Sequence, residues 1–312
     1  MSPRAANCHF GASGLKFRGF AVLRSINAPC LMPPAFASDV EFNKLVARRG
    51  DVDLVELMLE FAADAYPEVD RAKCLSELDR LGRRARRQMA ERDGDGQSLA
   101  GRLKTLSQVL YRDERFRGNE EAYYDPRNSY LNEVLARRRG IPISLAIVYT
   151  AVAARAGVST FGVAAPGHFV VGARENGESW FVDPFHEGLV LDREACQRRI
   201  EEVLGEQGVL GDEHFRPASA LEIGARVLRN LKAAYVMENQ WAPALPVQQR
   251  LALLLPDAPD ERRDLGLMYL RNCRPMSAID LLENYVAGCS GEQAQAVGPY
   301  LRAARRMAAE LN

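Results

Sequence analysis

Three polar residues in the middle of the chain have the types and order of a nucleophile, a base and an orienting acid. Ser144 lies at the start of an apolar run, His168 near the start of a predicted strand, and Asp183 at the end of the next strand. An acid that fixes the imidazole tautomer lets a histidine take the proton of a nucleophile. A helix N-terminus also supplies free N–H groups that stabilise a developing anion. The three residues therefore predict hydrolysis or acyl transfer.

A predicted hairpin brings the histidine and the acid together. Residues 168–173 and 179–182 have the composition of strands, and Asn176-Gly177 between them is a strong hairpin-turn signal. With Asn176-Gly177 at the turn, His168 and Asp183 are diagonal neighbours on one face of the sheet. Such neighbours are about 7 Å apart at the backbone, so we expect a hydrogen bond between His168 and Asp183.

Helices are expected on both sides of this hairpin. Apolar residues recur at helical spacing in most of the remaining segments, and residues 143–155 are apolar nearly all round, which predicts a buried central helix. Further short strands are predicted at 160–164 and 189–191. The other helices expected in the first two thirds of the chain are 39–47, 53–65, 69–91, 98–111, 127–138 and 192–204.

The C-terminal third predicts a helical repeat. Leu231 and Leu265, Tyr235 and Tyr269, and Ala244 and Ala278 are each separated by 34 residues, the period of the tetratricopeptide helix-turn-helix unit. Because the grooves of such arrays usually bind peptides or helices, we expect a protein or peptide partner there.

The composition excludes several classes of function. The 41 basic and 41 acidic side chains cancel, which argues against a nucleic-acid or anionic-membrane partner, and no run approaches the roughly 20 apolar residues of a membrane span. The six cysteines are scattered without a CxxC motif, and there are only four histidines. We therefore expect a cytoplasmic protein without disulfides, with no metal site and no cofactor. The oligomeric state is left undefined.

The motifs around the three polar residues resemble a known family. The segment 116–188, with NSYLN, RGIPIS, PGHF and VDPF, is similar to the transglutaminase-like superfamily, which has a papain-type core. It looks like the bacterial invasion-regulator-type subfamily, in which that core is joined to C-terminal tetratricopeptide-like repeats. In this resemblance His168 and Asp183 match the family's histidine and acid. Ser144 stands where the working enzymes of the family have a cysteine.

The resemblance implies an α+β fold class. We expect a mainly helical, transglutaminase-like core with a small antiparallel sheet in residues 38–205, followed by all-α tetratricopeptide-like repeats in residues 218–312. Residues 1–37 are acid-poor before Asp39 and lack helical periodicity. They predict a disordered tail, or a reading frame begun too early, with Met32 as the true start.

Each candidate site residue has a structural alternative. Ser144 has the residue type of a helix N-cap, His168 that of a structural histidine, and Asp183 precedes a proline that favours a turn. Asn128 and Asn132 could donate to an oxyanion, although we prefer a role in bracing their helix. Four further residues have weaker assignments: Tyr124 and Asp125 line the cleft or pack, His186 has no assigned partner, and Cys196 is a core residue or a displaced nucleophile.

Three functional hypotheses follow. The first is a non-catalytic transglutaminase-like protein that acts as a regulator or scaffold and binds a partner through its repeats. The second is a Ser144–His168–Asp183 hydrolase or acyltransferase acting on peptide or amide bonds. The third, to which we give little weight, is an enzyme that uses a cysteine from elsewhere, such as Cys196.

Overall fold

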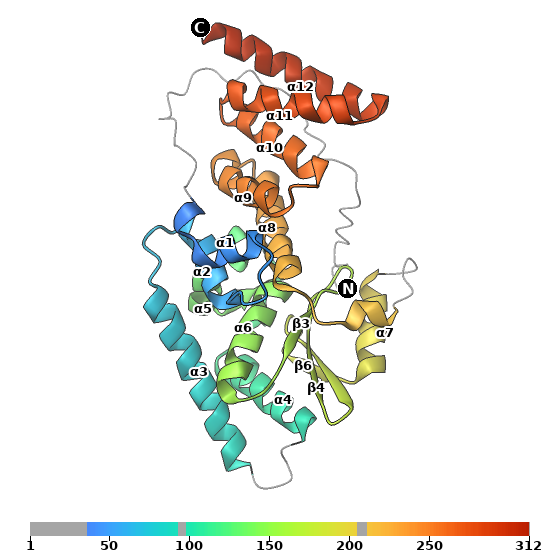
Figure 1. Cartoon of the computed structure of the whole chain (residues 1–312). Coiled ribbons are helices and arrows are strands. Elements are labelled where there is room, and N and C mark those ends of the chain that lie inside the picture. Colours follow the sequence, from blue (N-terminus) through green and yellow to red (C-terminus); the bar gives the residue numbers. More distant parts are fainter. Residues whose placement is uncertain (1–35, 93–97, 205–210, 312) are drawn as a thin grey trace. The chain divides into compact units, whose positions relative to one another are not determined.

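The computed structural model describes residues 36–92, 98–204 and 211–311. These residues are mainly helical and include a small antiparallel sheet, as predicted (Figure 1). Their contacts form two compact units. The first comprises the described residues of Asp39–Asn239, and the second those of Gln240–Asn312 together with Phe36–Ser38. Of the predicted tail, residues 1–37, all but the last two residues lie outside the described part of the chain.

The first unit contains the predicted helices with some changes at their ends. The expected helix 98–111 finishes in a π-helical turn, and the expected helix 127–138 is interrupted at Ser129 and Tyr130. The helical elements are α1 (Val40–Val46), α2 (Leu54–Ala63), α3 (Arg71–Glu91), α4 (Leu99–Ser107), η3 (Gln108–Asp113), η4 (Pro126–Asn128), α5 (Leu131–Arg137), α6 (Pro142–Ala156), α7 (Arg193–Leu204), η6 (Asp212–Phe215) and α8 (Ala220–Met237).

Helix α6 is the buried centre of the first unit. It starts at Pro142, whose missing N–H costs nothing at the first helical position, and most of its side chains are buried, as its sequence predicts. Helices α3 and α5 pack against it, and so do strands β3 (Phe161–Val163) and β4 (Val170–Glu175) (Figure 1). The residue at its first turn, Ser144, is therefore fixed by a helix that is held on several sides.

The sheet has the order β3-β4-β5-β6, all antiparallel, with β5 at Glu178–Asp183 and β6 at Leu189–Leu191. Val171 pairs with Val182 and Glu175 with Glu178, so the register predicted from the Asn-Gly turn is confirmed. Both turn residues have positive φ, at 49° and 83°, which Asn and Gly tolerate. Helix α7 packs against β5 and β6, with a cluster of buried side chains around the sheet: Val163, Ala165, Val170, Phe181, Cys196, Ile200 and Phe215.

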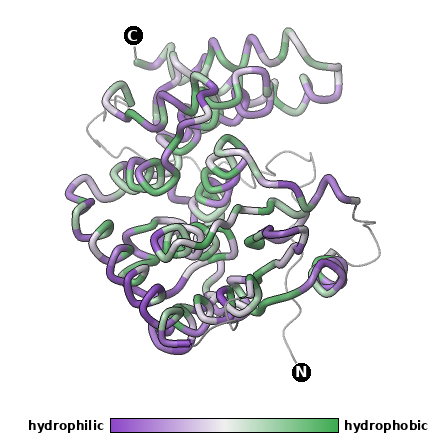
Figure 2. Tube along the Cα trace, turned by 60° about the horizontal axis from the view of Figure 1, so that its bottom comes forward, coloured by the Kyte–Doolittle hydropathy of each residue, from purple (hydrophilic) through white to green (hydrophobic). Residues whose placement is uncertain are grey.

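The described elements of the second unit are all helices. Its helices are α9 (Trp241–Leu254), α10 (Pro259–Arg271), α11 (Pro275–Gly288) and α12 (Gly291–Glu310), with the short η1 (Phe36–Ser38). The matched alanines of the predicted repeat, Ala244 and Ala278, are both fully buried, in α9 and α11. Hydrophilic and hydrophobic residues are interspersed along α12, and its buried residues recur at the spacing of a helix with one buried face (Figure 2). Among the described helices, none is long and apolar enough to cross a membrane.

Two further strands form a separate short ladder in the first unit. β1 (Arg117–Gly118) and β2 (Arg139–Gly140) run parallel, and Gly118 lies opposite Gly140. The ladder closes the loop that contains η4 and α5 and brings both ends of that loop beside α6. The predicted domain limits, 38–205 and 218–312, stay predictions.

Candidate functional site

His168 and Asp183 lie side by side, as the sequence predicts. His168 precedes β4 by two residues, in a turn where its N–H donates to the Ala165 carbonyl at 3.3 Å, so the predicted strand 168–173 starts too early. Its Nε2 lies 3.0 Å from Asp183 Oδ2. Only 4% of His168 and none of Asp183 is exposed. Although this distance is short, Nε2 makes no hydrogen bond of good geometry, so its N–H direction is poorly aligned with the Asp183 oxygen.

The Asp183 carboxylate is held as an anion by several donors. Oδ1 accepts the backbone N–H groups of Phe185 at 3.1 Å and His186 at 3.3 Å, which forms the turn that follows β5. Burial raises the pKa of Asp183, but the close contact with His168, the hydrogen bond with His186 and the charges of both imidazoles outweigh burial and hold that pKa well below its usual range.

A second histidine, which the sequence analysis leaves without a partner, contacts the same carboxylate. His186 Nδ1 lies 2.8 Å from Asp183 Oδ2. Arg199, on α7, places Nε 3.6 Å from the same oxygen. The signal for His186 is its position three residues after Asp183, within reach of a turn, whereas nothing local indicates Arg199. The predicted His168–Asp183 pair is therefore part of a larger cluster, in which three side chains contact Asp183 Oδ2.

Ser144 bonds to backbone groups instead of the histidine. It is the third residue of α6 and not its N-cap, but its hydroxyl still caps the helix, because it accepts the backbone N–H of the N-cap residue Ile141. Its hydroxyl donates to the Asn128 carbonyl at 2.6 Å and accepts the Ile141 N–H at 3.1 Å. Ser144 is 3% exposed, and the described residues include no hydrogen bond from it to His168 or Asp183. The structure therefore brings two of the three predicted residues into direct contact.

The two facing glycines of the β1–β2 ladder allow this packing. A Cβ added at Gly118 would lie 2.6 Å from the Phe185 ring and 2.7 Å from the Phe185 carbonyl oxygen. A Cβ at Gly140 would lie 2.6 Å from Ser144 Oγ. Real Cβ atoms do not approach other atoms this closely, so only glycine lets the ladder lie against both Ser144 and the turn after Asp183.

Asn128 braces the loop that precedes it, and not the predicted helix 127–138 that the preferred interpretation named. Its side chain is fully buried, accepts a hydrogen bond from Asn119 at 2.9 Å and donates to the carbonyls of Ala122 and Tyr123 at 2.7 and 3.2 Å. Both hydrogens of its amide are therefore used within the loop, and its backbone carbonyl receives the Ser144 hydroxyl. An oxyanion would have to displace these bonds.

The other cleft candidates differ in their surroundings. Asn132 is half-buried, and its Oδ1 is a buried acceptor with no partner among the described residues. Asp125 accepts the Arg127 N–H at 2.9 Å and pairs with Arg127 and Arg137; burial raises its pKa, but these contacts leave it below the usual value. The Tyr124 ring meets the Tyr123 ring edge-on, and Tyr123 in turn meets Phe185.

Cys196 does not have the properties of a nucleophile. It is fully buried in the cluster that packs around the sheet. Burial and the nearby Asp183 charge raise the pKa of the thiol to about 12. Because the thiolate is the reactive form, a thiol of this pKa is inert near neutral pH. This argues against the hypothesis that an enzyme reaction uses Cys196.

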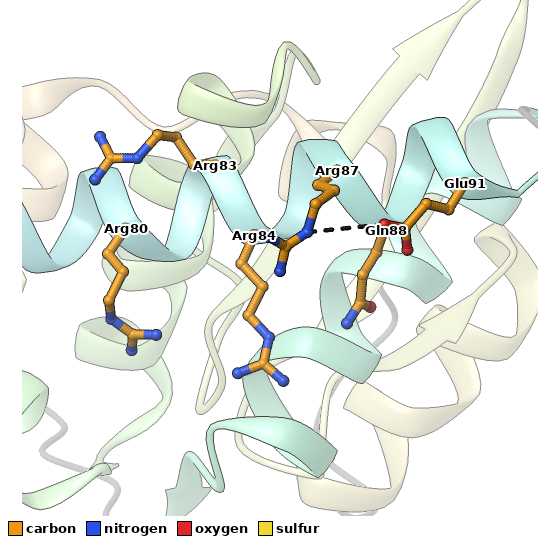
Figure 3. A pocket seen from close by; sticks show the side chains of 6 residues that line it. All are labelled: Arg80, Arg83, Arg84, Arg87, Gln88 and Glu91. Carbon is orange, nitrogen blue, oxygen red and sulfur yellow. Dashed lines mark ion pairs between the residues drawn. The ribbon is translucent and has the colours of Figure 1, made fainter.

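A hollow on α3 is a poor alternative site. It has a volume of about 620 Å³, and its lining residues are Arg80, Arg83, Arg84, Arg87, Gln88 and Glu91 (Figure 3). The positive charge there is largely compensated: Arg80 and Arg84 both contact Glu114, at 2.7 and 2.6 Å, and Arg87 pairs with Glu91 at 3.8 Å. An anion would compete with these carboxylates.

Comparison with known proteins assigns the fold to a family. The sequence profile described as "Transglutaminase-like superfamily" matches residues 72–229, half of the chain. The chain belongs to the transglutaminase-like superfamily. A second profile, "Tetratricopeptide repeat", matches residues 231–311, which confirms the predicted repeat. No solved structure matches the chain.

The curated relatives are bacterial proteins of one named group. A "UPF0162 protein" of Xylella fastidiosa (strain 9a5c) is 37% identical over 190 residues, which cover 59% of this chain and 67% of that protein. A "UPF0162 protein" of Vibrio cholerae is 27% identical over 245 residues, 78% of this chain and 88% of its own length. The Escherichia coli (strain K12) "UPF0162 protein YchA" is 27% identical over 246 residues, 78% and 87% of the two chains.

The contact between Gly140 and Ser144 makes a testable prediction within this transglutaminase-like domain. Gly140→Ala is expected to lower the free energy of unfolding by about 1 to 3 kcal/mol, because the new Cβ overlaps the Ser144 hydroxyl. In a Ser144→Ala background, which lacks that hydroxyl, the cost of Gly140→Ala should fall by about 1 kcal/mol. Urea unfolding of the four proteins in this double-mutant cycle measures the coupling. Additive effects would contradict the predicted overlap.

Proposed function

We propose that this protein is a non-catalytic transglutaminase-like protein that acts as a regulatory or scaffolding module and binds a protein partner through its C-terminal repeats. The observation that carries the proposal is the state of Ser144. A serine nucleophile must give its proton to the base during attack. Here the hydroxyl at the position of the family's cysteine is buried and donates to the Asn128 carbonyl at 2.6 Å.

The repeat region supports the binding half of the proposal. Tetratricopeptide repeats generally mediate protein–protein interactions. Among the exposed large apolar side chains of the second unit, two lie within its helices: Leu253 on α9 is 52% exposed and Met276 on α11 is 64% exposed. These side chains are candidate contacts for a partner and give positions at which binding can be tested without touching the buried core.

Covalent labelling tests the non-catalytic half. The native protein is treated with a fluorophosphonate probe and, separately, with a thiol-directed probe that mimics an amide substrate, and adducts are located by peptide mapping. We expect labelling of Ser144 no greater than in heat-denatured protein. An adduct on Ser144 that disappears in a His168→Ala variant would overturn the proposal, because it would identify an activated serine.

Cross-linking in cells tests the partner. Tagged protein expressed from its own locus is cross-linked, and partners are identified with the positions of the cross-links. We expect one partner whose cross-links map to residues 240–311, are lost in Met276→Arg and persist in Ser144→Ala. Val40→Arg is the matched control, since Val40 is a similarly exposed apolar residue, at 61%, in the first unit. Equal loss in both arginine variants would contradict binding through the repeats.

A second function is favoured by the His168–Asp183 contact. Nε2 of His168 faces Asp183 at 3.0 Å, so in the tautomer that carries its proton on Nε2 the Nδ1 atom would be the base. A Ser144-dependent hydrolase or acyltransferase acting on peptide or amide bonds would use this base after the Ser144 hydroxyl leaves Asn128. Such an enzyme requires Ser144, so full turnover by Ser144→Ala would contradict it.

A further inference from the structure

One carboxylate oxygen is contacted by two imidazole nitrogens. His168 Nε2 and His186 Nδ1 lie 3.0 and 2.8 Å from Asp183 Oδ2, and the three atoms are within 4.8 Å of one another. The histidines come from different segments, one from the turn before β4 and the other from the turn after β5. An aspartate that only orients a base needs one imidazole, here that of His168. The contact of His186 with the same oxygen therefore needs another explanation.

The donor set has the composition of a transition-metal site. Neutral imidazole suits Zn²⁺, Cu²⁺, Fe²⁺ and Ni²⁺, whereas Ca²⁺ and Mg²⁺ prefer sites made of oxygen. Ligands about 2.1 Å from a tetrahedral Zn²⁺ lie about 3.4 Å from each other. The distances from Asp183 Oδ2 to His168 Nε2 and His186 Nδ1 are shorter than this by about half an ångström. Small side-chain rotations would therefore seat an ion among the three atoms.

An unpartnered nitrogen in the cluster also favours a bound metal ion. Nε2 of His168 is buried and makes no aligned hydrogen bond, although it points towards the cluster. Buried polar atoms without a partner are rare in folded proteins. A metal ion bound to Nε2 would satisfy this atom. The side chain of His186 is 34% exposed, so an ion can reach the cluster and keep a coordination position open to solvent.

One positive charge opposes the cation and has an alternative partner. Arg199 Nε lies 3.6 Å from Asp183 Oδ2, and its Nη1 lies 3.9 Å from a Glu202 carboxylate oxygen on the same helix. The Arg199 side chain is 33% exposed. It can therefore turn towards Glu202 when a cation takes its place beside Asp183.

We propose that His168, Asp183 and His186 form a binding site for one divalent transition-metal ion, with Zn²⁺ as the probe. The sequence predicts no metal site, because its six cysteines are scattered and it has only four histidines. The inference is independent of the proposed function, because Ser144 is not a ligand. Bound metal would occupy His168 and Asp183 together and so prevent the pair from acting as a base.

Zinc binding to the full chain tests the proposal. The protein is stripped with a chelator, kept reduced and titrated with Zn²⁺ by isothermal calorimetry, and the bound metal is counted after equilibrium dialysis. We expect one high-affinity ion per chain. His186→Ala, at a half-exposed residue, should weaken binding at least about a hundredfold and abolish the Zn²⁺-dependent rise in Tm. Asp183→Asn should have the same effect on affinity if circular dichroism shows that it folds.

Matched controls separate this site from other zinc ligands. His214 is partly buried and makes contacts only with Gly211 and Glu213 among the described residues, so His214→Ala should leave the affinity unchanged. Co²⁺ gives a further test, because cysteine ligands produce a strong near-ultraviolet charge-transfer band that a His₂Asp site lacks. Absence of stoichiometric Zn²⁺ binding, or binding unaltered in His186→Ala, would overturn the proposal. A thiolate band would overturn it too.

Discussion

Replacing Asp183 with alanine is expected to lower the free energy of unfolding of the first unit by about 3 to 5 kcal/mol. The carboxylate is fully buried and is contacted by His168, His186 and two backbone N–H groups. Its removal leaves the buried His168 imidazole without its carboxylate and the partly buried His186 and backbone N–H groups without their acceptor, so the turn after β5 loses the bonds that shape it.

The measurement uses a tryptophan in the same strand as Asp183. The chain has two tryptophans, Trp180 in β5 and Trp241 in the second unit, so a Trp241→Phe background makes Trp180 fluorescence specific for the first unit. Urea unfolding in that background gives the effect of Asp183→Ala. Asp79→Ala is the matched control, because Asp79 is half-exposed and pairs with Arg155 at the surface. We expect less than about 1 kcal/mol there.

The pH dependence of the Asp183 effect has a defined sign. Because the folded-state pKa of Asp183 lies below its ordinary value of 3.8, the carboxylate contributes stability above that pH and loses the contribution as the pH falls below it. The difference in free energy of unfolding between wild type and Asp183→Ala should therefore shrink as the pH falls below 3.8. A difference that does not shrink there would show that the carboxylate is not held as an anion.

Gly118→Ala is expected to destabilise the first unit by about 2 to 3 kcal/mol. The added Cβ would lie 2.7 Å from the Phe185 carbonyl oxygen, a backbone atom that cannot rotate away, and 2.6 Å from the Phe185 ring. The overlap must be relieved by moving either the β1–β2 ladder or the turn between Asp183 and Gly188. Both movements disturb the candidate site.

The same Trp180 fluorescence measures this effect, and labelling reports on the site. Gly50→Ala is the control, because a Cβ at Gly50 meets no atom within 4 Å, and it should be neutral or slightly stabilising. If Ser144 is buried by this packing, Gly118→Ala should also increase its reactivity towards an electrophilic probe. Equal stability of the two variants would mean that the ladder does not lie against Phe185 as described.

Local sequence patterns predicted the features that depend on residues close along the chain. The Asn176-Gly177 turn defined the register of β4 and β5, because a two-residue turn leaves one pairing. The all-round apolar character of residues 143–155 identified α6 as the central helix, and the 34-residue period identified the repeats. These signals are local or periodic. The hairpin register alone was enough to predict that His168 and Asp183 are close to each other.

The tertiary structure decided the features that join distant segments. The bond from Ser144 to the Asn128 carbonyl spans 16 residues and depends on how the loop between β1 and β2 is closed, which no local pattern encodes. His186 and Arg199 reach Asp183 only because the turn after β5 and helix α7 meet at one oxygen. The residue types were enough to select the candidate residues. Which of them are in contact depends on the tertiary fold, which brings distant segments together.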